Sequence, residues 1–552
     1  MALRLITGRS GQGKTEYLVQ EVIRLSMENP QQKYYVIVPE QFSLEMQRKM
    51  VKKHPRHGFF NIDVLSFHRL AYRIFDECGY QPGEILEDLG VSMMLRKILS
   101  EGENNFLYFK KSMKKAGFID ELKSMLMEFI GYGVTWEQVE EVSEKLGENK
   151  ALSNKCKELG RIYEHFEKAI EGRFMVTEQI LDVAREFAKE APMLTNAVFY
   201  FDGFAGFTPV QLAFLKELLK VAGQINVTIT IPEFVPGQRG MPEDLFTSSK
   251  KTGDALLMLC QENMQEVEEV VKLDTPVSPR FINNPELAFL EKNLFQNSRK
   301  IYSKKIERIH MTVCHNPDGE ADYVMHKIEQ LVRQKGYRYR DFAVLSGDVA
   351  DYASAFKRKA AILNIPVFED TKKKVSYHSG VEAVRSLFHL AQMEYSYESV
   401  FRYLKSGMSN LIDEDADYLE NYVLYAGVRG YSMWKKPFYR RLKNKDEAAI
   451  KALLLLQEKF MEETENFCSV MRDKEASVRD KIEVLYHTMV KLSFEEKLKN
   501  QAQKAEENSD FVKAAEYRQL YDLLLSLMDK IVMIFGEEKM AVKELAEIVD
   551  AG

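Results

Sequence analysis

Cysteine, glycine and proline are all sparse in this 552-residue sequence. The five cysteines, Cys78, Cys156, Cys260, Cys314 and Cys468, are scattered and include no CxxC pair, which excludes a disulfide framework. Glycine and proline number only 29 and 15, which excludes collagen-like or low-complexity chains and favours helix. The sequence also lacks a signal peptide and any apolar run near the roughly 18 residues of a membrane span. We therefore expect a cytoplasmic protein with no membrane partner.

A strong excess of one charge is also missing, since the formal net charge is −6. A uniformly basic nucleic-acid binder is excluded, and any DNA surface must be a local basic patch. Hydrophobic residues make up 45% and charged residues 29%, as in ordinary globular proteins. The length predicts two to four domains with sizeable cores.

Short apolar runs alternate with helical patterns at the start of the chain. Residues 3–7, 34–38 and 61–65 have the composition of buried strands, and a helix is expected from Lys14 to about Met27. Strand character returns at residues 197–202 and 225–231. The pattern predicts βαβ units and a parallel sheet, hence an α/β fold.

The intervening residues are mostly amphipathic helix, so the fold should be helix-rich with large insertions. We expect a first α/β domain from residues 1–72 and 190–280, interrupted by a helical insertion at 73–189. A polar, proline-containing stretch at about 275–285 is a candidate boundary after it. A second α/β domain should begin at 281–396, with strands at 309–314, 342–346 and 365–368 and a helix at 319–335. Residues 397–552 should form a further helical insertion. Because no strand pattern follows, we expect that the second sheet is not closed within this chain.

The strongest motif is a glycine-rich turn between the first predicted strand and helix. It has the form G-x-x-x-x-G-K-[ST], in which backbone N–H groups curl around phosphates, the lysine reaches the β- and γ-phosphates, and the hydroxyl binds Mg²⁺. The motif predicts ATP and Mg²⁺ as cofactors, and the alternative is a structural glycine-rich turn. The residues expected to bind ATP are Gly8, Arg9, Ser10, Gly11, Gln12, Gly13, Lys14 and Thr15.

A P-loop enzyme also needs a carboxylate at the end of a second strand to hold Mg²⁺, usually followed by an acidic residue that activates water. Asp202 ends the predicted strand at 198–201 and fits the first role beside Thr15. The next residue is Gly203, so the usual position of the base holds no carboxylate. The alternative interpretation of Asp202 is a turn residue at a strand end.

Several motifs recur in a specific order. Three segments resemble successive motifs of UvrD-like superfamily 1 helicases: the glycine-rich turn, VIVPEQF at 36–42 and VLSFHRLA at 64–71. Their residues are most similar to those of the AddB family. DGFAGFTPVQ at 202–211 is similar to that family's degenerate helicase motif II. Residues 336–345, 365–368 and 419–424 extend the resemblance to about residue 435.

The resemblance implies two RecA-like domains, the second incomplete, in the N-terminal half of a subunit of an ATP-dependent helicase/deoxyribonuclease. Such a subunit would pair with an AddA-type helicase-nuclease and process double-strand DNA breaks for recombinational repair, with Chi-type sequence recognition. The family's C-terminal half carries a nuclease and an iron–sulfur cluster held by four cysteines. None of the five cysteines here is assigned as a cluster ligand.

Two departures from active helicases bear on whether the chain is an enzyme. Gly203 replaces the general base, so hydrolysis should be slow even when ATP binds. Only seven residues precede Gly8, which leaves no room for the upstream glutamine segment that grips adenine in active relatives. The resemblance therefore implies an inactive motor.

Candidate DNA contacts follow from aromatic residues interleaved with cations. They are Ser66, Phe67 and His68, where relatives contact single-stranded DNA, Lys110 and Lys111 within the run 106–115, and Trp434 within the run 434–441. Residues 337–340 are similar, whereas Lys372–Lys374 has the character of a solvated loop. The alternative for each run is inward-packed aromatics beside solvated cations.

The sequence leaves rival hypotheses open. The chain could be an autonomous superfamily 1 helicase or ATPase in which Glu40 or another carboxylate supplies the base. It could also be a DNA-binding scaffold with a vestigial P-loop. A small-molecule P-loop kinase would leave the ordered motifs beyond residue 60 unexplained.

Overall fold

A computed structural model of the chain describes residues 2–101, 106, 108–113, 117–146, 150–238, 244–294, 300–368, 375, 378–438 and 447–551. The chain divides into two compact units. The first consists of Met1–Arg280 and Ser376–Gly552, and the second of Phe281–Val375. The first division falls within the polar, proline-containing stretch that the sequence marks as a boundary.

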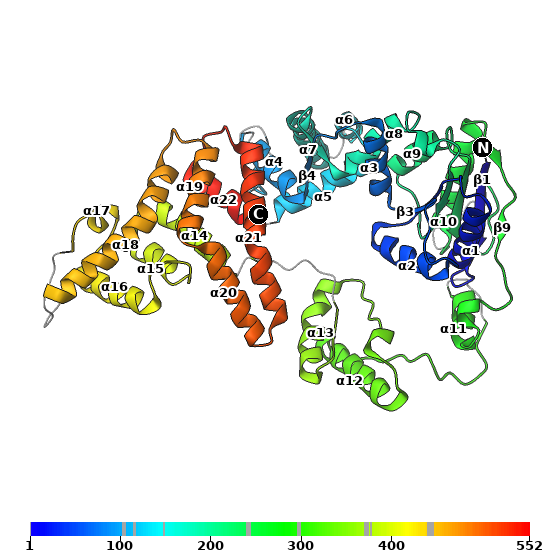
Figure 1. Cartoon of the computed structure of the whole chain (residues 1–552). Helices are drawn as coiled ribbons and strands as arrows, with labels where there is room; N and C mark the ends of the chain where they lie inside the picture. The colour runs from blue at the N-terminus through cyan, green and yellow to red at the C-terminus, as the bar shows by residue number, and fades with distance from the viewer. Residues whose placement is uncertain are drawn as a thin grey trace. The chain divides into compact units, whose positions relative to one another are not determined.

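The first unit is built on a parallel sheet of seven strands (Figure 1). Their order is β3-β2-β6-β7-β1-β8, and β9 also pairs with β1. Strands from both sides of the inserted block therefore share one sheet, which confirms the predicted α/β fold. The strands are β1 (Ala2–Gly8), β2 (Tyr34–Ile37), β3 (Ile62–Leu65), β6 (Val198–Phe201), β7 (Gln224–Thr230), β8 (Glu266–Val267) and β9 (Val271–Lys272).

Side chains of this sheet alternate between two apolar cores. Tyr35 and Ile37 join Phe199 in one core, whereas Tyr34 and Val36 face the other. Because helices cover both faces, β1, β2, β3, β6 and β7 are mainly apolar, and short apolar runs were enough to predict these five strands. The two-residue strands β8 and β9 are largely exposed and were not predicted. The first core is covered by α3 (Phe67–Cys78), α8 (Ile180–Phe187), α9 (Pro209–Leu218) and α10 (Thr247–Glu262), and the second by α1 (Lys14–Glu28) and α2 (Ser43–Lys53).

The block between α3 and α8 is mainly helical, as predicted, but it also contains two short strands. β4 (Glu84–Leu86) and β5 (Phe174–Val176) form a parallel pair of their own. Three residues are too few to produce a recognisable strand pattern in the sequence. The helices of this block are α4 (Asp88–Glu101), α5 (Phe118–Gly131), α6 (Trp136–Lys145) and α7 (Lys150–Ile170).

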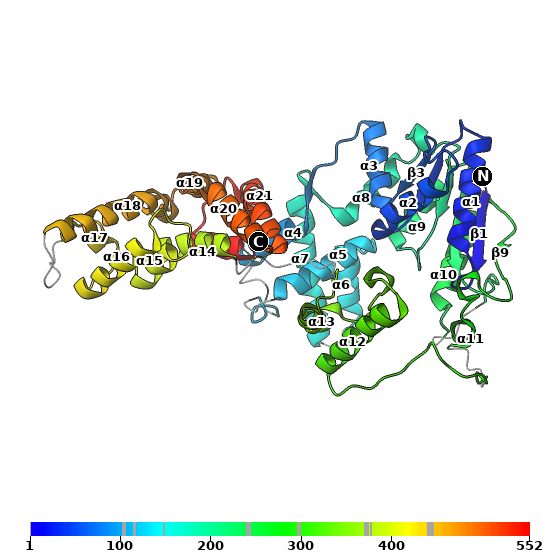
Figure 2. The same ribbon diagram turned by 60° about the horizontal axis from the view of Figure 1, so that its bottom comes forward.

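The described residues after 378 contain helices and no strand. In both views α18 runs beside α16, and α20 beside α21 (Figures 1 and 2). The helices are α14 (Ser379–Gln392), α15 (Tyr397–Leu404), α16 (Asp413–Ala426), α17 (Tyr431–Trp434), α18 (Glu447–Arg472), α19 (Val478–Lys491), α20 (Phe494–Glu507), α21 (Phe511–Phe535) and α22 (Val542–Ala551).

Within the first unit, this helical region packs on the inserted block through the contact of α21 with α4. The Lys530 ammonium lies 2.6 Å from the Glu87 carboxylate, and Lys97 pairs with Glu538. These contacts group the residues after 376 with the first unit, whereas the sequence pattern places 376–396 in a second α/β domain.

The second unit contains α11 (Pro285–Asn293), α12 (Pro317–Lys335) and α13 (Val349–Leu363). The prediction of a helix at 319–335 is confirmed. The strands predicted at 309–314, 342–346 and 365–368 are wrong, because the described residues of this unit form no strand. These segments have the apolar composition of strands, but no neighbouring strand in the described part of the unit satisfies their backbone groups.

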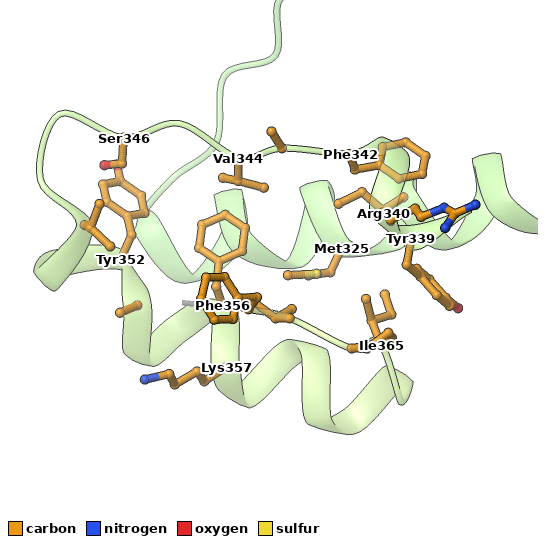
Figure 3. A pocket seen from close by; sticks show the side chains of 17 residues that line it. Met325, Tyr339, Arg340, Phe342, Val344, Ser346, Tyr352, Phe356, Lys357 and Ile365 are labelled. Atoms are coloured by element: carbon orange, nitrogen blue, oxygen red, sulfur yellow. The ribbon is translucent and has the colours of Figure 1, made fainter. Parts of the chain in front are cut away.

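Two of these segments instead line an apolar pocket of about 740 Å³. Figure 3 shows Met325 of α12 and Phe356 of α13 facing the same space, with Val344 across from them. Leu345 and Phe368 are 94% and 89% exposed. The second unit therefore presents apolar side chains that no described segment covers.

Candidate functional site

The glycine-rich loop, residues 8–15, connects the carboxyl end of β1 to the first turn of α1. Gly11 and Gly13 have φ of +78° and +91°, a region that residues with a Cβ avoid, so the tight curl depends on glycine. The Lys14 ammonium donates to Gly8 O at 2.8 Å and to Arg9 O at 3.1 Å. The Lys14 side chain thus lies against the glycine-rich loop, where the motif predicts that it contacts phosphate.

The side chains of Thr15, in the first turn of α1, and Asp202, just after β6, are in contact. The Thr15 hydroxyl donates to Asp202 Oδ2 at 2.7 Å, and the Thr228 hydroxyl of β7 donates to Oδ1 at 2.7 Å. Asp202 is 5% exposed and directly follows β6. A hydroxyl and a carboxylate are hard oxygen donors of the kind that Mg²⁺ takes together with phosphate oxygens and water. The residue types at this position therefore fit a magnesium ion.

Charge near the start of α1 is balanced locally. Glu16 lies in the first turn and pairs with Lys53, and its carboxylate is 3.6 Å from the Lys49 ammonium. The hydrogen bond from Lys53 lowers the pKa of Glu16 below its usual value. The negative charge of Glu16 is thereby offset by α2, so it opposes an anion at the loop less.

The residue after Asp202 is held in an unusual conformation. Gly203 has φ of +83°, and a Cβ built on it would lie 3.5 Å from Pro39 Cδ. Glu40 follows Pro39 in a short 3₁₀ turn, and its carboxylate lies 3.6 Å from His68 Nδ1 and 3.7 Å from Arg69 Nε. The nearby Glu40 carboxylate thus lies beside the His68 and Arg69 side chains at the start of α3.

Of the three residues proposed at the start of α3, only His68 reaches the surface well. Its side chain is 45% exposed, whereas Ser66 is buried and caps the helix by accepting from Arg69 N at 3.3 Å. Phe67 is also buried, with its ring centroid 5.4 Å from that of Phe204. Ser66 and Phe67 therefore support this edge from inside. Tyr72, later in α3, and Phe42, in the turn after β2, are exposed.

The other predicted DNA contacts differ in exposure. Lys110 and Lys111 are exposed on a turn whose Tyr108 and Phe109 amides donate to the buried Glu158 carboxylate at 2.6 and 3.1 Å. Trp434 is fully buried, 4.7 Å from the Phe460 ring, so it does not offer a face to a base. Lys114 and Lys115, Lys372–Lys374 and residues 439–441 lie outside the described residues.

The chain is similar over its whole length to proteins of one family. A family model described as "ADDB, N-terminal" matches residues 5–291. The chain belongs to this AddB family. A relative from Lachnoclostridium phytofermentans is 32% identical over 100% of this chain and 49% of its own length. One from Thermoanaerobacter pseudethanolicus is 32% identical over 100% and 48%, and one from Clostridium botulinum strain Hall 30% over 100% and 48%.

All three relatives are named as subunits of an ATP-dependent helicase/deoxyribonuclease. The AddB-family chain spans about half the length of the curated relatives it matches. The resemblance predicted from ordered motifs is therefore confirmed at the level of the family.

Two residues of the candidate site were missed in the sequence. Thr228 holds Asp202, and it was detectable as a polar residue at an inward position of the apolar strand 225–231. Thr275 bonds to the buried Gln12 side chain, and nothing in the local pattern indicates this partner. Contacts between segments more than 200 residues apart leave no periodic signal.

Two further observations bear on the predicted cofactors and partners. In the part of the chain that the structure describes, no three His, Cys, Asp or Glu side chains gather in a way that could hold a metal ion. Among the described helices, none is both long and apolar enough to cross a membrane.

Proposed function

We propose that this AddB-family chain is the nucleotide-holding, helicase-like half of a helicase/deoxyribonuclease subunit. It would act with an AddA-type partner on double-strand DNA breaks. The observation that carries the proposal is the contact of Thr15 with Asp202 at 2.7 Å, at the end of the glycine-rich loop. A hydroxyl from the loop and a carboxylate from the end of a second strand are the two protein ligands that a P-loop protein gives to Mg²⁺.

In this proposal each group has a defined role toward ATP. The N–H groups of the loop and the N-terminus of α1 bind the phosphates, and the Lys14 ammonium turns from Gly8 O and Arg9 O to the β- and γ-phosphates. Thr15 and Asp202 hold the magnesium ion, and Thr228 keeps the Asp202 carboxylate oriented. The ion supplies positive charge at the phosphates.

The same site should hold ATP without turning it over quickly. No carboxylate follows Asp202, so no side chain at that position orients or deprotonates the attacking water. We propose that the chain grips DNA and scans it for a Chi-type sequence rather than driving translocation. The exposed His68 and Arg69 at the carboxyl edge of the sheet, and the pair Lys110 and Lys111, support a DNA-contacting role.

Calorimetry of ATP·Mg²⁺ binding, paired with DNA-stimulated phosphate release, tests the proposal. Replacing Lys14 with alanine should weaken binding about 10- to 100-fold, because a charge-assisted bond to phosphate is lost. Lys33→Ala is the matched control, since Lys33 is exposed just before β2, away from the loop. Binding that depends on Lys14, with negligible release, supports the proposal.

The rival functions predict different results in the same assay. Brisk release that depends on Lys14 and is lost in Glu40→Gln would favour the autonomous helicase or ATPase. Glu40 is a specific candidate because Pro39, the residue before it, lies beside Gly203. Absence of binding in the unmodified chain would favour the scaffold with a vestigial loop.

A further inference from the structure

The segment Asp274–Arg280, here called the strap, lies against the glycine-rich loop. It continues from β9, where Val271 and Lys272 pair with Ile6 and Thr7 of β1, and the Leu273 amide donates to Thr7 O at 2.8 Å. The strap ends at the last residue before the second unit begins at Phe281. It is therefore both a neighbour of the loop and one of the two chain connections between the units.

The Gln12 side chain joins the loop to the strap. Its Oε1 accepts from the Thr275 hydroxyl at 2.6 Å and from the Thr275 amide at 3.1 Å, and its Nε2 donates to Thr275 O at 3.2 Å. Gln12 is only 5% exposed. A buried carboxamide that makes three bonds to a single residue fixes that residue closely, because leaving either end unpaired is costly.

The strap also follows the carbonyl side of the loop. The Ser278 hydroxyl donates to Ser10 O and the Arg280 amide to Gly11 O, each at 3.4 Å. A Cβ built on Gly11 would stand 2.6 Å from Ser278 Oγ and 2.8 Å from Arg280 Cβ. The fit is close enough that the loop and the strap cannot change shape independently at this point.

We propose that Gln12 is a positioning residue that couples nucleotide binding at the loop to docking of the strap. This inference rests on the proposed nucleotide site. A phosphate bound to the N–H groups of Gly11 and its neighbours uses one side of the same peptide units whose carbonyls face the strap. Hydrogen bonds on both sides of a peptide unit polarise and strengthen each other. A loop already ordered by the strap also loses less conformational freedom when phosphate binds.

Such coupling is reciprocal. If the docked strap raises the affinity for nucleotide, nucleotide must stabilise the docked strap by the same factor. Nucleotide bound at the loop would then stabilise the docked position of Arg280, where the chain leaves the first unit. Gln12 would thus pass the nucleotide state of one unit to the chain that enters the other.

Hydrogen exchange of the whole 552-residue chain, with and without ADP·Mg²⁺, tests this coupling. In the unmodified chain the amides of Thr275 and Arg280 should exchange at least about fivefold more slowly when ADP is bound. Thr275→Val keeps the shape of the side chain but removes its hydroxyl, and Gln12→Ala removes the carboxamide. Both variants should bind ADP about 5- to 20-fold more weakly, and ADP should no longer slow strap exchange.

Gln32→Ala is the matched control. Gln32 also donates to a distant backbone carbonyl, Asn196 O at 2.7 Å, but at the amino end of the sheet. Its ADP affinity and strap exchange should match those of the unmodified chain. Because Thr275 lies outside the loop, its variant tests the coupling even where Gln12→Ala disturbs the loop itself.

The outcomes separate the two proposals. Absence of ADP binding in the unmodified chain overturns the nucleotide site and the coupling together. If ADP binds normally but the hydrogen-exchange rates of the strap amides are the same with and without ADP, only the coupling is overturned. Weaker binding in both variants, without an ADP effect on strap exchange in the unmodified chain, means that Gln12 merely stabilises the fold and also overturns it.

Discussion

One backbone angle, at Gly203, limits what can replace the missing carboxylate after Asp202. The φ of +83° is open to glycine and costs about 1–2 kcal/mol for a residue with a Cβ. Gly203→Glu should therefore lower the free energy of unfolding of the first unit by this amount. It should also fail to raise phosphate release, because a side chain at this φ leaves the backbone in a different direction from that of an ordinary strand residue.

Gly203→Ala is the control for that substitution, since it carries the same backbone cost without a carboxylate. Chemical denaturation and DNA-stimulated phosphate release measure the two effects. Faster release in the Glu variant but not in the Ala variant would contradict this expectation.

Two buried thiols, Cys260 and Cys468, should be unreactive in the folded chain. Burial raises the pKa of each to about 11. At pH 8 only about one thiol in a thousand is then ionised, and the thiolate is the reactive form. The folded pKa lies above the unfolded value of about 8.5, so between these two values the thiols ionise more readily in the unfolded chain. The free energy of unfolding is therefore unaffected by these thiols below pH 8.5 and falls as the pH rises toward 11.

Alkylation with iodoacetamide at pH 8, followed by mass spectrometry of the peptides, measures this protection. Cys260 and Cys468 should be labelled slowly until denaturant is added, and labelling should accelerate as the pH approaches 11. Native labelling as fast as at the partly exposed Cys156 and Cys314 would contradict it.

At the scale of elements, a loop between α15 and α16 is held by two helices. The Glu463 carboxylate of α18 accepts from the hydroxyls of Tyr403 and Ser409 and from the Asn410 amide, each at 2.9 Å. Lys497 of α20 donates to Met408 O and Ser409 O, also at 2.9 Å. Burial lowers the pKa of Lys497, so its bonds to the loop offset a real desolvation cost.

Glu463→Ala should destabilise the first unit by about 2–4 kcal/mol, because it leaves three donors, two of them buried hydroxyls, without their acceptor. Exchange of the Asn410 amide should accelerate in parallel. The neighbouring Glu462 has a side chain that is 70% exposed and pairs with Lys491, so Glu462→Ala should change stability by less than about 0.5 kcal/mol. Equal effects of the two substitutions would contradict the role of Glu463 in holding the loop between α15 and α16.

The five longer strands of the first sheet were predictable, as was α12 in the second unit, but the three strands predicted in the second unit were wrong. Strands such as 34–37 are buried on both faces and carry their own continuous apolar signal. Residues 342–346 and 365–368 carry a similar signal, but a strand also needs a hydrogen-bonding neighbour, and local sequence does not state whether one is present. The same limit applies to Trp434 and Phe67, because aromatic composition alone does not separate a buried ring from an exposed one.

The candidate site divides in the same way. Gly8–Thr15 and Asp202 were found from spacing and strand ends, since their chemistry needs fixed residue types at fixed positions. Thr228 and Thr275 act through tertiary contacts, and any residue with a hydroxyl at the right place would serve.

At the scale of the whole molecule, the uncovered apolar side chains of the second unit should govern how the chain behaves in solution. Met311, Leu345 and Phe368 are each close to fully exposed, in segments that form neither helix nor strand. Exposed apolar segments of this kind favour association between molecules. The isolated chain should therefore associate as its concentration rises.

Light scattering across a concentration series checks this expectation. Replacing Leu345 and Phe368 together with lysine should weaken association. Leu424→Lys, at an exposed apolar position on α16, should leave it unchanged. A monomer at all concentrations in the unmodified chain would contradict the prediction.

The strand order has a consequence for synthesis on the ribosome. β1 precedes the other strands of this sheet in the sequence, yet its sheet neighbours are β7, which begins at Gln224, and then β8 and β9. At about 5–20 residues per second, β1 waits roughly 10–45 s before a partner has been translated. During that interval the nascent chain carries the apolar strand β1 without its sheet neighbours, so the glycine-rich loop, although it precedes those neighbours in the sequence, is among the last parts of the first sheet to take its folded form.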